Sequence, residues 1–278
     1  MAPATGSSRP SVQAFRSAWI SVLRFGLCVV LTSLLLSVVA LPWLQLSWWR
    51  VFRRCVSIGT IISIWICATK FEHRRLSSYG LSGWRGAGQR QFLSGIAMGV
   101  AGLGLLLAIG LASGSCTLHV TTDQRKLWLV VLGFLPAAPL VGLLEELAFR
   151  GFLLRHLMDW SRPLAVIISS ALYALVHLKT PEWTNATSRE LFGLFLLGVV
   201  LAVATLRTGQ LYLAIGLHAV LAYGARANKV LIELSDASAG WLVGTSRLIN
   251  GIASWIVLVA IGAVVVWWTQ PQRRGGTG

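Results

Sequence analysis

The chain has 278 residues, of which 55% are hydrophobic and 12% charged, and its mean hydropathy is +0.72. A soluble domain carries about 25% charged residues, so the composition excludes a soluble globular protein and favours a polytopic membrane protein. The net charge of +15 comes from Lys and Arg spread over nearly every loop, a distribution that suits contacts with anionic lipid headgroups. Nucleic-acid binding needs a basic face on a soluble fold, so no nucleic-acid partner is expected.

Long apolar stretches predict an all-α, polytopic protein with about eight transmembrane helices, because a helix needs ~20 apolar residues to cross the bilayer. Four of the stretches are shorter than this length, which leaves room for one or two fewer crossings. In chain order the stretches are Ala18–Trp43, Val56–Thr69, Leu93–Ala112, Leu127–Phe149, Pro163–Leu178, Leu191–Leu206, Leu211–Ala225 and Gly251–Trp268.

Polar ends bound this apolar region. We predict a polar N-terminal segment at residues 1–17, a single helical membrane domain at 18–268, and a disordered Gly-rich tail at 269–278. After the seventh stretch, Arg226–Arg247 is predicted to be a long loop that covers the mouth of a site in the membrane domain. The sequence therefore predicts one membrane domain with short polar ends.

Two adjacent glutamates, Glu145 and Glu146, lie near the end of the fourth stretch, and Arg150 closes it. A carboxylate at membrane depth costs about 2.5 kcal/mol or more, so such residues are usually functional. On a helix, Glu146 and Arg150 share a face in the order that favours an ion pair. Glu145 points about 100° away from Glu146. Arg150 is therefore predicted to hold Glu146, while Glu145 meets a histidine, a water or a metal.

Two histidines lie in later apolar stretches: His177, with Tyr173 one turn before it, and His218. A single such histidine usually forms only an interhelical hydrogen bond, and a pair of acids can simply be a charged helix end. Two imidazoles beside carboxylates can instead ligate a divalent metal or deprotonate water. We therefore predict a water-activating site. Its metal ligands, if a metal is used, are Glu145, His177 and His218.

These residues resemble three motifs of the CAAX-protease and bacteriocin-processing family of membrane proteins, also called the CPBP or abortive-infection family. That family carries EExxxR, then FxxxH, then HxxxN, in successive helices. The second motif has Tyr in place of Phe here, and the third is approached by Gly-Gln-Leu-Tyr and Ile-Gly-Leu-His. The matching segments are Glu145–Arg150, Tyr173–His177 and Gly209–His218, within a family-like core at about 127–225.

The resemblance implies an intramembrane endopeptidase that cleaves a membrane-associated or lipid-modified peptide. It implies that Glu145 and His177 activate the attacking water. It also implies that Glu146 and Arg150 support the acid-bearing helix and that His218 stabilises the oxyanion. Family members have been viewed as metallo- and as glutamate-type proteases, so the cofactor is either zinc or another divalent metal, or none. The expected location is a bacterial inner or cytoplasmic membrane.

One departure from the family pattern opens two alternatives. Ala222 stands where the third motif has Asn, four residues after His218, so one candidate oxyanion donor is absent. The first alternative is a membrane binding protein of the same fold with reduced or no catalysis. The second is a proton-coupled transporter in which Glu145, His177 and His218 form a relay, although the inverted repeats typical of transporters are absent from the sequence.

Overall fold

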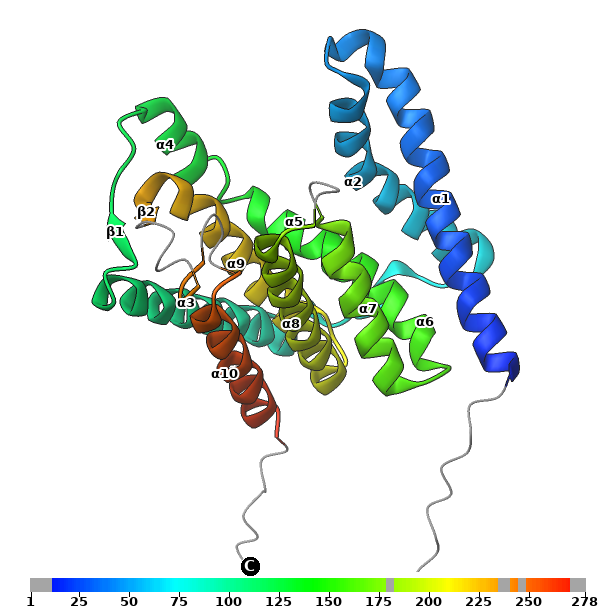
Figure 1. The fold of residues 1–278 in the computed structure, drawn as a ribbon. Coiled ribbons are helices and arrows are strands. Elements are labelled where there is room, and N and C mark those ends of the chain that lie inside the picture. The colour runs from blue at the N-terminus through cyan, green and yellow to red at the C-terminus, as the bar shows by residue number, and fades with distance from the viewer. Residues whose placement is uncertain (1–11, 179–182, 235–240, 245–248, 271–278) are drawn as a thin grey trace, which may run out of the picture.

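The computed structural model describes residues 12–178, 183–234, 241–244 and 249–270, and these residues are almost wholly helical (Figure 1), which confirms the all-α prediction. The long helices are α1 (Val12–Leu44), α2 (Trp48–Ile66), α3 (Gln89–Ala112), α4 (Gln124–Val131), α5 (Ala137–Glu146), α7 (Arg162–Val176), α8 (Asn185–Thr208), α9 (Tyr212–Leu231) and α10 (Ile252–Trp268). Shorter elements are α6 (Arg155–Met158), the π- or 3₁₀-helical segments η1 (Cys67–Phe71), η2 (Leu76–Tyr79), η3 (Trp84–Gly88) and η4 (Leu147–Leu154), and the strands β1 (Cys116–Leu118) and β2 (Ile232–Leu234).

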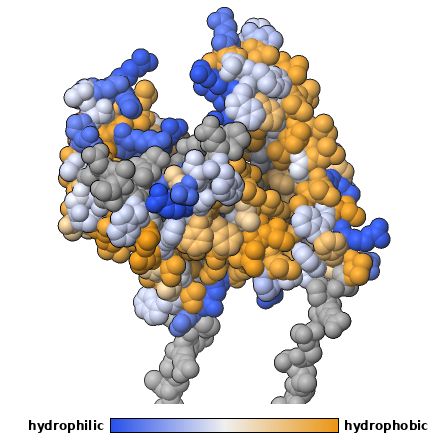
Figure 2. Space-filling view, viewed as in Figure 1, coloured by the Kyte–Doolittle hydropathy of each residue, from blue (hydrophilic) through white to orange (hydrophobic). Residues whose placement is uncertain are grey.

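Within the described residues, four helical segments are long and apolar enough to cross a membrane. They are α1, Trp48–Phe71, Leu76–Ala112 and α8, and α7 and α10 are shorter apolar helices. Figure 2 shows hydrophobic side chains over most of the visible face, with hydrophilic ones concentrated at its upper rim and lower edge. The chain is therefore an integral membrane protein.

The fourth predicted stretch, Leu127–Phe149, is not one continuous helix. Helix α4 ends at Val131 and α5 begins at Ala137, directly after Pro136. Proline lacks the N–H that a helix interior requires and is tolerated at a helix start, which accounts for the break. From Ala137 the chain continues without interruption through α5, η4 and α6 to Met158. The two glutamates therefore lie near the middle of one continuous helical segment.

Glycines bring α3 and α9 into close contact. A Cβ atom at Gly95 would overlap the carbonyl oxygen of Leu213, and one at Gly216 would overlap the carbonyl oxygen of Phe92. Small residues let membrane helices approach closely, and packing rather than the hydrophobic effect holds such helices together. Because His218 follows Gly216 by two residues, this contact fixes the position of the histidine in the middle of the protein.

The prediction of a loop at Arg226–Arg247 is wrong for the first part of that segment. Helix α9 continues to Leu231, and β2 then pairs antiparallel with β1, with Thr117 opposite Glu233. Residues 235–240 and 245–247 of that stretch lie outside the described residues, as do residue 248, residues 1–11 and most of the predicted tail, 271–278. The N-terminal prediction needs one correction, because α1 already begins at Val12.

The largest cluster of buried apolar side chains lies among α7, α8, α9 and α10. Tyr173 of α7 belongs to it, together with Leu201 of α8, Leu217 of α9 and Val257 of α10. A separate hairpin of α1 and α2 stands beside this bundle (Figure 1) and contacts it through α5, η4 and α6. The main core thus lies between the later helices, and two of these, α7 and α9, carry histidines of the predicted site.

Candidate active site

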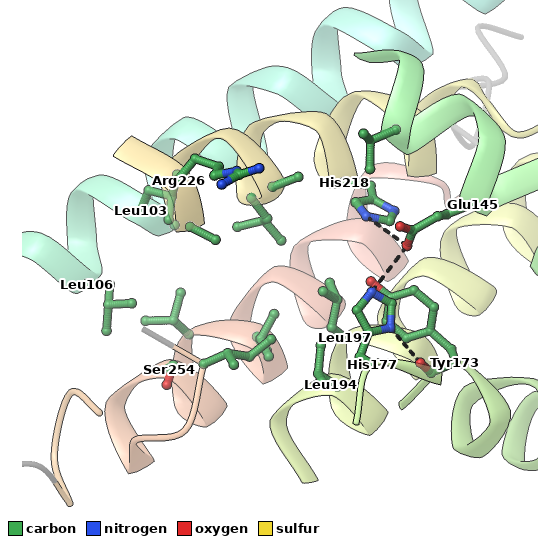
Figure 3. A pocket seen from close by; sticks show the side chains of 18 of the residues that line it. Leu103, Leu106, Glu145, Tyr173, His177, Leu194, Leu197, His218, Arg226 and Ser254 are labelled. Carbon is green, nitrogen blue, oxygen red and sulfur yellow. Dashed lines mark hydrogen bonds and ion pairs between the residues drawn. The ribbon is translucent and has the colours of Figure 1, made fainter. Parts of the chain in front are cut away.

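Three helices bring the predicted site residues together. Glu145 comes from the last turn of α5, His177 from the C-terminal end of α7 and His218 from the middle of α9. Figure 3 shows the three side chains converging at one end of a cavity. Directly after Glu146 the helix changes to the π-helix η4. Such segments are rare and occur frequently at functional sites, and sequence reasoning did not predict this one.

Glu146 is completely buried and is held by two partners. Its Oε1 atom accepts a hydrogen bond of 2.8 Å from Nη1 of Arg150 and lies 2.7 Å from Nδ1 of His218. Arg150 also donates to the carbonyl oxygen of Gly198 at 3.1 Å, and its guanidinium lies 4.6 Å from the centre of the Tyr173 ring. The predicted Glu146–Arg150 pair is confirmed, and its burial is compensated by direct charge pairing.

The hydrogen bonds of the two histidines identify which nitrogen carries the proton. Nδ1 of His218 faces Oε1 of Glu146, the oxygen that already accepts a hydrogen bond from Arg150, so we assign the proton to Nδ1. Nδ1 of His177 lies 2.8 Å from the carbonyl oxygen of Tyr173, which can only accept, so the proton is again on Nδ1. In the neutral imidazoles both Nε2 atoms therefore present a lone pair, and both face Glu145.

The Oε2 atom of Glu145 lies between these two nitrogens. It is 3.5 Å from Nε2 of His177 and 3.6 Å from Nε2 of His218 (Figure 3), longer than ordinary hydrogen bonds. Within the described part of the chain this buried oxygen has no hydrogen-bond partner. The side chains of Glu145 and His177 are nevertheless 29% and 27% exposed, so the centre is accessible. Spacings of this kind between polar groups are typical of a bridging water.

The same three residues were predicted to ligate a metal if one is used. A zinc site needs three or four ligand atoms at fixed distances around one point. Among the residues that the structure describes, no group of three or more His, Cys, Asp or Glu side chains has an arrangement that could hold a metal ion. The use of zinc or another divalent ion stays a prediction.

A cavity of about 420 Å³ extends from this centre, a volume within the usual range for ligand sites. Glu145, His177 and His218 lie at one end of it, and Ala222 lines it one helical turn after His218. The position where the family motif carries Asn thus faces the cavity with a methyl group. The apolar wall includes Leu103, Leu106, Leu194, Leu197, Leu221 and Val257.

The fold and the site together define a helical integral membrane protein with a carboxylate–imidazole centre that opens into an apolar cavity. Residues 126–223 match the family model described as Type II CAAX prenyl endopeptidase Rce1-like. The match contains all three motifs and almost coincides with the predicted core, so it agrees with the CAAX-protease family that the motifs resemble. A search of curated proteins found no match for the chain.

Two features of the site were missed by sequence reasoning. The first is the bond between His218 and Glu146, since each residue was assigned a different partner or role. The second is the part played by Gly198, whose carbonyl oxygen receives the second bond of Arg150. A Cβ at Gly198 would lie 2.8 Å from Cβ of Ser170, so close packing of α8 on α7 requires a glycine. A glycine inside an apolar helix is a weak signal for such a contact.

Proposed function

We propose that the protein is an intramembrane endopeptidase that hydrolyses a peptide bond in a membrane-associated, lipid-modified peptide. The observation that carries this proposal is the convergence of two imidazole Nε2 atoms on one carboxylate oxygen of Glu145, at 3.5 and 3.6 Å, with no ordinary hydrogen bond to that oxygen among the described residues. A centre of this composition can hold and deprotonate water. The matched family is described as a CAAX prenyl endopeptidase, which supports a prenylated peptide as the substrate.

In the proposed reaction, Glu145 acts as the general base. Its carboxylate accepts a proton from a water molecule that Nε2 of His177 also holds by accepting the water's second O–H. The water oxygen then attacks the carbonyl carbon of the peptide. When the carbon–nitrogen bond breaks, the proton on Glu145 passes to the leaving amine nitrogen. The second proton of the water passes from the new carboxyl group through Nε2 of His177 to the same nitrogen, so one water is consumed and a carboxylate and an ammonium group are produced. Each proton therefore has a named donor and acceptor.

His218 has a different proposed role. Nδ1 of His218 lies 2.7 Å from Oε1 of Glu146, and this contact leaves Nε2 facing Glu145. With a second proton on Nε2, His218 can donate to the negative oxygen of the tetrahedral intermediate. Arg150 holds the same carboxylate of Glu146 through its own bond of 2.8 Å. Glu146 is not proposed as the base, because its side chain is completely buried and already bonded to Arg150 and His218.

The experiment uses the full chain in lipid nanodiscs, with a quenched fluorescent peptide that carries a prenylated cysteine. Cleavage by the parent that disappears in Glu145→Gln and in His177→Gln, with both variants folded, supports the proposal. Undiminished cleavage by Glu145→Gln overturns it. A parallel incubation with a chelator tests the metal: activity lost on chelation and restored by zinc assigns a metalloprotease, whereas unchanged activity assigns a glutamate-type protease.

A second candidate function rests on Ala222, which lines the cavity without offering a hydrogen-bond donor. In this candidate the protein binds a lipid-modified peptide without cleaving it. This second candidate function predicts that the parent protein binds the prenylated peptide without cleaving it, and that the Ala222→Asn variant cleaves it. Glu145-dependent cleavage by the parent eliminates this candidate. The bacterial inner or cytoplasmic membrane as location stays a prediction.

A further inference from the structure

A groove runs between α8 and α10 on the outer surface of the bundle, and we call it the α8–α10 groove. It has a volume of about 490 Å³. Its walls include Leu196, Val199 and Val203 of α8 and Val259, Ala263 and Val266 of α10. Gln270 is the one polar side chain among its described lining residues. Val259 and Trp267, which also lines it, are 60% and 71% exposed. In a membrane protein such a groove opens towards the lipid.

The α8–α10 groove is separate from the active-site cavity, although the same two helices contribute to both. Helix α8 presents Leu197 to the cavity and Leu196 to the groove. Helix α10 presents Ile261 to the cavity and Gly262 to the groove. The two have no described lining residue in common. The proposed reaction and its substrate therefore leave the α8–α10 groove without a role.

A cation is fixed at one end of the groove. Helices α8 and α10 run side by side in the same direction (Figure 1), because the rings of Phe192 and Trp255 meet near their first turns and Arg207 joins their last turns. Arg207 donates from Nε to Oγ1 of Thr269 at 3.0 Å and from Nη2 to the carbonyl oxygen of Val266 at 3.2 Å. Among the described residues no carboxylate pairs with this guanidinium. A guanidinium has five N–H donors, so donors remain for a ligand.

The surroundings of this guanidinium favour a negative charge. The sequence has no Asp or Glu in 191–232 or in 237–278, so neither α10 nor the part of α8 along the groove carries an acid. A second cation, Arg90, lies 5.8 Å from the centre of the Trp268 ring at the same end of α10. Tryptophans gather where membrane meets water, and Trp267 and Trp268 are the last residues of α10. The cationic end of the groove therefore lies at the depth of the lipid headgroups.

The length of the groove matches one leaflet of a bilayer. From Leu196 to Arg207 on α8 is eleven residues, as is Val259 to Gln270 on α10. Eleven residues correspond to about 16 Å along a helix, which is close to half of the ~30 Å hydrocarbon core. A transmembrane helix of a partner would need a groove that crosses both leaflets. A lipid chain that starts at the headgroup level and ends near the membrane centre fits this length.

We propose that the α8–α10 groove binds one anionic phospholipid, with an acyl chain between the two helices and the phosphate on Arg207. The planar fork of a guanidinium matches the oxygens of a phosphate, and basic pockets between membrane helices suit anionic headgroups. This lipid site does not depend on the proposed function, because the groove and the active-site cavity share no described lining residue. The lipid packs on the outer side of a wall whose inner side faces the cavity.

Binding is measured by the quenching of Trp267, which lines the groove. The full chain is placed in nanodiscs of phosphatidylcholine with increasing fractions of phosphatidylglycerol that is brominated on its acyl chains. Bromine quenches tryptophan fluorescence on contact, and subtracting the signal of Trp267→Phe isolates the contribution of this residue. Because the anionic headgroup gains charge-assisted bonds, half-maximal quenching is expected at about a tenfold lower fraction than with brominated phosphatidylcholine.

A substitution that fills the groove tests the position of the acyl chain. A Cβ at Gly262 would lie 3.4 Å from Cγ2 of Val200, an ordinary van der Waals contact, so Gly262→Leu is expected to fold. It should reduce the quenching of Trp267 by both lipids to the level set by their bulk fraction. Gly104→Leu on α3 is the matched control, because a Cβ there meets nothing within 4 Å, and it should leave binding unchanged.

Substitutions of Arg207 test the position of the phosphate. Arg207→Gln should make the quenching curves of the two brominated lipids coincide. Arg207→Lys keeps the charge without the planar fork and should retain part of the preference for the anionic lipid. Arg54→Gln is the matched control, since Arg54 is an exposed cation of α2 that lines neither the groove nor the cavity, and it should leave the preference intact.

Three results would overturn the lipid site. The first is a preference for the anionic lipid that is absent in the parent or that survives Arg207→Gln. The second is a groove covered by another copy of the chain: neither lipid would then quench Trp267 in the parent, and Gly262→Leu would lower the particle mass in detergent from dimer to monomer. The third is displacement of the brominated phosphatidylglycerol by the prenylated peptide, which would assign the groove to the lipid of the substrate.

Discussion

The glutamate–histidine clusters around Glu145 and around Glu72 differ in how completely their hydrogen bonds are made. In the first, Oε2 of Glu145 lies 3.5 and 3.6 Å from the two histidine Nε2 atoms and, within the described residues, forms no hydrogen bond of ordinary length. In the second, Oε1 of Glu72 lies 2.9 Å from Nε2 of His156, and Oε2 accepts a bond of 2.5 Å from the Tyr79 hydroxyl. Nδ1 of His156 lies 2.8 Å from the carbonyl oxygen of Phe152.

The comparison shows how the same side-chain types serve two purposes. A saturated buried network rigidifies the structure, and the Glu72 cluster ties the connection between α2 and α3 to helix α6. An unsatisfied buried oxygen costs free energy, and a native protein that keeps one usually has a functional reason. The difference therefore predicts that changes around Glu145 alter activity, whereas changes around Glu72 alter stability.

The largest expected effect is on turnover. Glu145→Gln keeps the shape of the side chain and removes the proton acceptor, so cleavage should fall about 10²–10⁴-fold, while the thermal midpoint changes little. Glu72→Gln is the matched control, with the opposite expectation of a lower midpoint and nearly unchanged cleavage in the folded fraction. Both quantities are measured on the same nanodisc preparations. Equal losses of activity in the two variants would remove the distinction between the clusters.

Next in size is a loss of stability at Arg150. Arg150→Met leaves the buried carboxylate of Glu146 without its guanidinium, and breaking a buried pair by removing one partner costs about 3–5 kcal/mol. Adding Glu146→Gln to the same variant should recover part of that cost, since the uncompensated charge is then gone. Denaturant unfolding in detergent micelles provides the comparison. A double variant less stable than the single one would show that the pair is not held by charge compensation.

His156→Gln should have a smaller effect. It removes one bond to Glu72 and one to the carbonyl oxygen of Phe152, at a cost of about 1–3 kcal/mol for the groups left unpaired. Tyr79→Phe, which removes only the other bond to Glu72, is expected to cost less. Cleavage at a temperature where both variants are folded should equal that of the parent. A drop in turnover without unfolding would mean that this cluster also shapes the active site.

The two clusters also differ in how far they could be predicted. The Glu146–Arg150 pair and the direction of Glu145 away from Glu146 follow from the 3.6-residue helical period, because all three residues lie on one short segment. The bond of His218 to Glu146 joins residues 72 positions apart and depends on how closely α9 packs on its neighbours. Residues on one helix are placed by its period, whereas residues on different helices are placed by packing that a single sequence does not reveal.

The rest of the fold follows the same division. Hydropathy located the apolar helices, because length and composition are local properties. The Glu72 cluster was not predicted, since Glu72 and Tyr79 lie in a connection without periodic pattern, and nothing in the Leu147–Leu154 segment distinguishes a π-helix from an α-helix. The resemblance to family motifs indicated that His177 and His218 belong with Glu145, which the helical period alone does not show. The motifs therefore supplied the long-range contacts that local rules omit.

The smallest predicted effect concerns Ala222, where a substitution can add one hydrogen-bond donor to the cluster around Glu145. Ala222→Asn places an amide in the cavity one turn after His218. A single oxyanion donor is worth about 10²–10³-fold where a site has formed around it. An added donor without supporting contacts should give less, so we expect a rise in kcat well below this range. Ala225→Asn is the matched control, because it puts the same amide in the same cavity nearly two turns from His218. Equal kcat values for the two variants would mean that the cavity one turn after His218 does not hold the oxyanion.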